Sequence, residues 1–254
     1  LGGTGVIGTA LGVYSPGTAD VLLHHYMGDV DGNVGSWGFA RGGMGSVAEA
    51  LAKSFQGFGG EIICDADVDQ IIVRNGKARG VALKNGTELY ADTVVSNLDP
   101  KRTFLDVMDE KDLPGEVIKK AQNFKIRGSS GKLNIALDGL PSFTGLDQGS
   151  PLMLGDYHFS DSLPRIERAY DDWKDGTWSK DPYVDVLIPT QTDPTMAPPG
   201  KHMMTVFVQY CPPKVHGNDW TAKDKAGFEK SVIDQIAAHS PDFKDLILHC
   251  ETRT

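Results

Sequence analysis

The chain has 254 residues, with 25 basic and 34 acidic side chains and a formal net charge of −9 at pH 7. Its 40 % hydrophobic and 23 % charged residues are proportions typical of a globular protein. An acidic surface repels phosphate backbones, so nucleic acid is not expected as a partner, and no run approaches the roughly 20 apolar residues of a transmembrane helix.

Cysteine usage favours a reducing compartment. The odd number of cysteines, Cys64, Cys211 and Cys250, at wide spacing gives neither a disulfide framework nor a CxxC motif. We therefore expect no metal site, and a cytoplasmic location, or a mitochondrial one in a eukaryote. Membrane contact is not indicated, and the oligomeric state is left open. Because the chain starts at Leu1 and stops just after the apolar run 246–248, we expect it to be an internal piece of a longer protein.

The first hundred residues combine two helices with a run of short strands. Apolar spacing predicts helices over 19–26 and 46–55. Alternating apolar residues and turn signals, including the pair Asn85-Gly86, then predict a five-stranded meander over 61–64, 69–74, 77–83, 87–90 and 93–96.

After Pro100 the pattern changes to longer elements, and we place a lobe boundary there. Helices are predicted over 116–123, 163–173 and 222–239, and strands over 132–137, 184–188 and 202–210. The strands over 184–188 and 202–210 are expected to pair across a Pro-rich loop at 189–200. The segment 157–159 is polar and poorly patterned, and it could cover the mouth of a cavity.

One motif near the start has the spacing of a dinucleotide-binding turn. Residues 3–8 read Gly-Thr-Gly-Val-Ile-Gly, which matches G-x-G-x-x-G. Pyrophosphate binding needs a long helix after this turn, but Ser15-Pro16-Gly17 breaks the helix early. It also needs a strand ending in an acidic residue about 20 positions on, where 19–26 instead reads helical. We expect a Gly-rich segment of a cap and no phosphate cradle.

Several segments in a fixed order carry a family resemblance. Residues 37–45 read Trp-Gly-Phe-Ala-Arg-Gly-Gly-Met-Gly, and they are followed by 59–62, 68–71, 80–86 and 91–100. This order resembles phytoene dehydrogenases and the wider amine-oxidase-like flavoproteins. Segments at 188–189, 193–202 and 209–210 extend the resemblance over nearly the whole chain.

The resemblance implies an α/β (α+β) fold: part of an FAD-binding lobe with a β-meander, and a mixed-sheet substrate lobe with helices. The implied divisions are a cap segment at 1–41, a partial FAD-binding lobe at 42–100 and a truncated substrate lobe at 101–254. In such proteins the cofactor is FAD, and its main Gly-rich segments lie outside the region matched here. We therefore expect FAD in the parent protein but not in this chain alone.

The resemblance also suggests cofactor contacts. It places the backbone of Val68 at the adenine end of FAD and Gly42-Gly43 close to the flavin, where glycines let the main chain approach a ring. From the residues alone, Val68 can equally be a core strand residue and the glycines a helix lead-in. Lys132, in Gly-Ser-Ser-Gly-Lys, resembles the amine-oxidase lysine that reaches the flavin through a water. The alternative is a lysine that faces solvent on an edge strand.

His24, His25 and Trp37 are candidates to line the substrate cavity. Adjacent histidines on a helix point about 100° apart, so they do not easily ligate one metal, and one can pack while the other lines the cavity. Two functions stay open for the parent protein: an FAD-dependent dehydrogenase or desaturase acting on an apolar small molecule, and a non-catalytic binding or scaffold protein. Whether this chain by itself is active is also left open.

Overall fold

A computed structural model describes residues 2–254 and divides the chain into two compact units. The larger unit joins Leu1–Ala50 to Arg127–Thr254, and the smaller unit is Leu51–Ile126. The divisions expected from sequence were 41/42 and 100/101. The segment after Pro100 packs with the meander instead, since the amide of Ile71 donates a hydrogen bond to the Val107 carbonyl. The assignment of residues 42–100 to an FAD-binding lobe stays a prediction.

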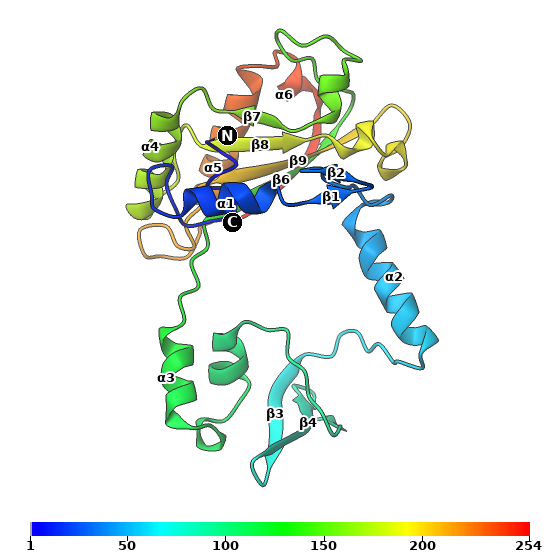
Figure 1. The fold of residues 1–254 in the computed structure, drawn as a ribbon, viewed down its shortest axis with the longest axis vertical. Helices are drawn as coiled ribbons and strands as arrows, with labels where there is room; N and C mark the ends of the chain where they lie inside the picture. The colour runs from blue at the N-terminus through cyan, green and yellow to red at the C-terminus, as the bar shows by residue number, and fades with distance from the viewer. Residues whose placement is uncertain (1) are drawn as a thin grey trace. The chain divides into compact units, whose positions relative to one another are not determined.

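The larger unit is built on a five-stranded sheet in the order β10-β6-β9-β8-β7 (Figure 1). Its strands are β6 (Ser130–Leu137), β7 (Tyr157–Phe159), β8 (Tyr183–Leu187), β9 (His202–Gln209) and β10 (Ile247–Arg253). Around it lie α1 (Thr18–His25), α4 (Leu163–Lys174), α5 (Ala222–Ala237), α6 (Phe243–Leu246) and the hairpin of β1 (Asp29–Val30) and β2 (Asn33–Val34). The α+β class is confirmed, but all pairings in this sheet are antiparallel, so the expected mixed sheet is wrong.

Alternation along β6 separates two faces of the sheet. Leu133, Ile135 and Leu137 are fully buried in the main core, whereas Lys132 and Ala136 are exposed on the other face. On the core face, α5 contributes a stripe of buried residues at helical spacing: Phe228, Val232 and Ile236. A capping box between Thr221 and Asp224 starts that helix.

The opposite face of β8 and β9 is partly covered by residues 2–14. Val6 is buried in a second cluster with Ile166, Ala169, Tyr183 and Tyr210. A Cβ at Gly3 would lie 2.4 Å from the Tyr183 ring, so close packing requires glycine there. At Gly3 the absence of a side chain therefore serves packing against Tyr183.

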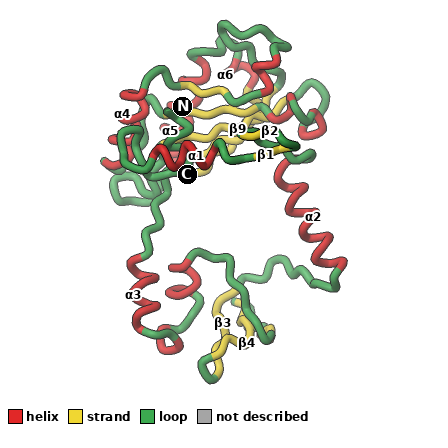
Figure 2. The backbone as a smooth tube through the Cα atoms, viewed as in Figure 1, coloured by secondary structure: helices red, strands yellow, loops and turns green. Residues whose placement is uncertain are grey.

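The smaller unit contains a three-stranded meander of β3 (Val68–Arg74), β4 (Lys77–Leu83) and β5 (Glu88–Tyr90), together with α3 (Gly115–Asn123). The β3–β4 turn uses Asn75-Gly76, both with positive φ (53° and 71°), as a tight hairpin requires. The predicted strands at 61–64 and 93–96 do not form (Figure 2). A strand needs a partner for its backbone groups, and none of the described residues pairs with these segments.

The helix α2 (Gly43–Gly57) crosses the division between the units at Ala50/Leu51. The strands β7 and β10 and the β1–β2 hairpin were not anticipated from sequence. Within residues 2–254, no helix is both long enough and apolar enough to cross a membrane.

Candidate functional site

A groove of about 570 Å³ lies on the sheet face opposite α5 in the larger unit. Strands β6 to β9 supply one wall, and the end of α1, the β1–β2 region and the N-terminal turn supply the other. The lining residues of the sheet are Lys132, Asp156, His158, Asp185, Leu187, Thr205 and Phe207; those opposite are Thr4, Ile7, His25, Tyr26, Gly35, Trp37, Gly38 and Phe39.

Sheet register places four of these side chains in one row. Lys132 pairs with Phe207, which also pairs with Asp185, and Asp185 pairs with His158. Directly paired residues share a face, and adjacent strands lie about 4.8 Å apart, so the Cα atoms of Lys132 and Asp185 are roughly 10 Å apart. The row therefore has a cation towards one end, an aromatic ring in the middle and an acid–imidazole pair at the other end.

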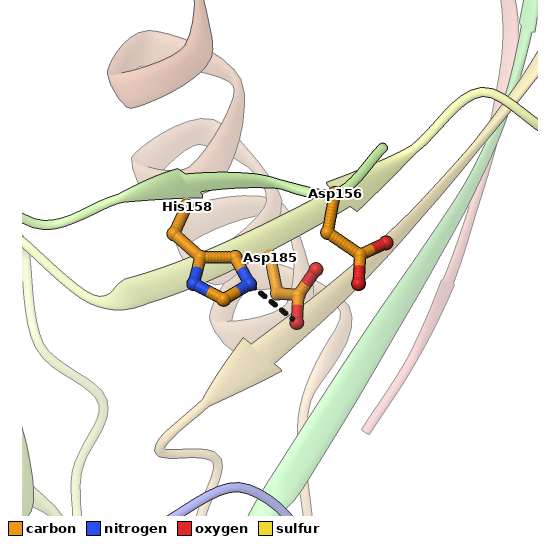
Figure 3. A group of neighbouring side chains, drawn as sticks. All are labelled: Asp156, His158 and Asp185. Atoms are coloured by element: carbon orange, nitrogen blue, oxygen red, sulfur yellow. Dashed lines mark ion pairs between the residues drawn. The ribbon is translucent and has the colours of Figure 1, made fainter. Parts of the chain in front are cut away.

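Asp156, just before β7, forms a tight polar group with His158 on β7 and Asp185 on β8 (Figure 3). His158 Nε2 lies 3.4 Å from Asp185 Oδ2. Contact with the Asp185 carboxylate raises the pKa of His158 above its ordinary value of 6.5. Desolvation, followed by repulsion from Asp185, raises the pKa of Asp156. Two acids and a base thus share one end of the groove.

The groove brings together three of the residues singled out from the sequence. The ring of His25 stacks on Trp37 with a centroid distance of 5.7 Å, and its Nδ1 lies 2.8 Å from the Val21 carbonyl. Lys132 lines the same groove from β6. His24 is exposed and is not among the groove-lining residues. Whether Lys132 is catalytic, and whether His25 and Trp37 contact substrate, are still predictions.

The sequence matches the model of the family described as flavin containing amine oxidoreductase over residues 8–249. The chain belongs to this flavin-containing amine oxidoreductase family. The solved structure of the PF1083 protein from Pyrococcus furiosus shares the fold, with a TM-score of 0.51 and 15 % identity over 84 % of this chain and 43 % of that one.

Two named relatives of the family are similar over most of the chain. Pyridine nucleotide-disulfide oxidoreductase domain-containing protein 2 of Mus musculus is 34 % identical over 96 % of this chain and 43 % of its own length. The chloroplastic prolycopene isomerase of Daucus carota is 32 % identical over 81 % of this chain and 30 % of its own. The chain therefore spans less than half the length of these relatives.

Family membership draws attention to the residues expected near FAD. Gly42 (φ +81°) donates its amide to Asp193 Oδ2 at 2.6 Å, and Gly43 (φ +75°) follows. Val68, in the smaller unit, begins β3 and is 39 % exposed. Whether Gly42, Gly43 and Val68 contact FAD stays a prediction from the resemblance.

Gln209 hydrogen-bonds to the backbone at the end of the turn over residues 3–8. Gly8 donates its amide to Gln209 Oε1 at 2.9 Å, and Gln209 Nε2 donates to the carbonyls of Val6 and Thr9, each at 2.8 Å. Gln209 on β9 thus holds this segment against the sheet. That the turn forms no phosphate cradle stays a prediction.

Sequence reasoning did not single out Asp156 and Asp185. It assigned 157–159 to a possible cavity cover, whereas the structure places these residues on β7 with His158 facing the groove. One signal was available: Asp185 stands alone between the apolar Val184 and Val186 of a strand. A lone acid in an otherwise apolar strand indicates a polar face that a site can use.

Proposed function

We propose that this chain forms the substrate-binding part of an FAD-dependent oxidoreductase of the dehydrogenase or desaturase type, which takes an apolar small molecule into the groove. The observation that supports this most directly is the convergence of Lys132, His25 and Trp37 on one groove. These residues lie far apart in sequence, and the fold of the larger unit gathers them. The parent protein, in this proposal, contributes the remainder of the FAD site.

The groove offers apolar surface along much of its length. Trp37 and Phe39 line one wall, and Leu187 and Phe207 line the sheet. Aromatic and aliphatic walls suit an apolar ligand, since burying its surface is the main source of affinity. Relatives named for prolycopene and 4,4'-diapolycopene support an apolar substrate.

When bound, FAD would supply the redox chemistry, while the protein positions the substrate and tunes the charge around the site. We assign to Lys132 the role of tuning the charge around the site. Its ammonium group lies on the groove side of β6 and would stabilise negative charge that develops nearby. His25 and Trp37 are assigned to shaping the wall that the substrate contacts.

The test uses the longer protein that contains this chain. Lys132→Met should slow flavin reduction by substrate at least about tenfold, with the stoichiometry of bound FAD unchanged. Lys214→Met is the matched control, since Lys214 is exposed, pairs with Asp219 and does not line the groove. Equal reduction rates in the Lys132 variant and the control would remove Lys132 from the mechanism.

A second variant tests the groove itself. Thr205 lies on β9 and lines the groove. Thr205→Trp should therefore fill part of the groove and raise KM for an apolar substrate. Unchanged KM, with intact far-UV circular dichroism, would show that the substrate binds elsewhere.

A further inference from the structure

We propose that Asp156, His158 and Asp185 bind one divalent transition-metal ion, of the Mn²⁺ or Zn²⁺ type, at the sheet wall of the groove. The proposal concerns binding to this chain and does not depend on the redox function proposed above. Each of the three residues offers one ligand atom, and these atoms all lie within 4.8 Å of one another.

Strands position two of the three side chains, His158 on β7 and Asp185 on β8, and Asp156 directly precedes β7. His158 on β7 lies directly opposite Asp185 on β8 in antiparallel register. Asp156 lies two residues before His158, just outside β7, and lines the same groove. Figure 3 shows the imidazole and the two carboxylates directed towards a common space. Rigid placement of this kind lowers the entropy lost when an ion binds.

The spacing of His158 and Asp185 is compatible with a shared metal ion. His158 Nε2 and Asp185 Oδ2 are 3.4 Å apart, whereas a charge-assisted hydrogen bond is about 2.7–2.9 Å long. Two ligands bound about 2.1 Å from a tetrahedral ion are themselves about 3.4 Å apart. The ligand atom of Asp156 lies within 4.8 Å of those of His158 and Asp185.

The charges around the group also favour a cation. Asp185 is only 8 % exposed, and among residues 2–254 its carboxylate has His158 as its ion-pair contact and no short hydrogen bond. The nearby Asp156 repels it. Lys132, the basic side chain in the same row, lies two strands away, so it does not neutralise the pair directly. A divalent ion between the carboxylates would relieve this repulsion.

The donor set narrows the kind of ion. Imidazole suits Zn²⁺ and other transition metals, and carboxylate oxygens suit Mn²⁺. Three protein ligands leave at least one coordination position open, and here it would face the groove. Such a position could take a water or an oxygen-bearing group of a bound molecule.

Mn²⁺ is the first probe because the exposed thiol of Cys64 competes for Zn²⁺ but has little affinity for Mn²⁺. Titration of the purified, metal-stripped chain should abolish the electron paramagnetic resonance signal of one equivalent of free Mn²⁺. Asp185→Asn and His158→Ala should each weaken binding at least about tenfold. His249→Ala is the control, since His249 is exposed on β10, and it should bind as the parent chain does.

Calorimetry with Zn²⁺ on a Cys64→Ser background provides the independent check, and circular dichroism confirms that each variant folds. Binding should weaken in acid, because protons and metal compete for the ligand atoms. Absence of saturable binding of both ions to the folded chain overturns the proposal. Equal binding by the His158, Asp185 and His249 variants does so too, since it shows adventitious surface binding.

Discussion

Replacing Gln209 with leucine should release the N-terminal segment from the sheet. The Gln209 side chain is fully buried, and its three hydrogen bonds at 2.8–2.9 Å go to Val6, Gly8 and Thr9. A leucine side chain is similar in size to that of glutamine, but it cannot hydrogen-bond to these backbone groups. The Val6 carbonyl keeps the amide and the hydroxyl of Thr9 as donors, whereas the Gly8 amide and the Thr9 carbonyl lose the partner that Gln209 provides.

The expected loss follows from these contacts. Three hydrogen bonds are lost, and each contributes about 0.5–1.5 kcal/mol to stability. The sum is about 3 kcal/mol in the free energy of unfolding, which corresponds to a fall in Tm of roughly 6–12 °C for a unit of this size. The Gly8 amide should also lose its protection against hydrogen exchange.

Gln235→Leu is the matched control. Gln235 is also buried and donates to the Phe159 carbonyl at 2.6 Å, but its own Oε1 has no partner. Leucine there removes an unpaired buried oxygen along with one hydrogen bond, so the net change should be within about 1 kcal/mol. Thermal unfolding followed by circular dichroism, and exchange at Gly8, measure both variants. If Gln209→Leu destabilises no more than Gln235→Leu, Gln209 does not anchor the segment.

Three further outcomes are expected. The hydrogen bond from the Gly42 amide holds the pKa of Asp193 below its ordinary value of 3.8. The ionised Asp193 therefore contributes to stability above about pH 4, and this contribution is lost as the pH falls through the lowered pKa. Asp193→Ala should remove this part of the acid transition in pH-dependent melts. Thr221→Ala should destabilise the larger unit by about 1 kcal/mol in urea unfolding, since it breaks the cap of α5. The purified chain should not retain FAD in a titration, because its G-x-G-x-x-G turn is bound by Gln209; a micromolar stoichiometric complex would contradict this.

The sequence by itself determined the elements whose pattern is local. Alternation along 132–137 and helical spacing of Phe228, Val232 and Ile236 indicated β6 and α5, and the structure confirms both within a few residues. Periodicity predicts these elements because the face of a helix or strand on which a side chain lies depends only on its position along that element. The ordered Gly-rich and turn motifs likewise indicated the flavoprotein family, which the family match confirms.

Strand pairing was decided only by the tertiary structure. The segments 61–64 and 93–96 have strand-like sequences but stay unpaired, whereas the short β7 forms because β8 offers it a partner. A strand exists only where another segment completes its hydrogen bonds, and that partner is not encoded in the strand's own pattern.

The groove depends on the tertiary structure for the same reason. Lys132 was identifiable as a candidate, but its common groove with His25 and Trp37 joins segments about a hundred residues apart. The approach of His158 to Asp185 depends on the register of β7 against β8, and a shift of one residue would turn either side chain to the other face. Composition and periodicity carry no information on that register, because it is set by the packing of the whole sheet.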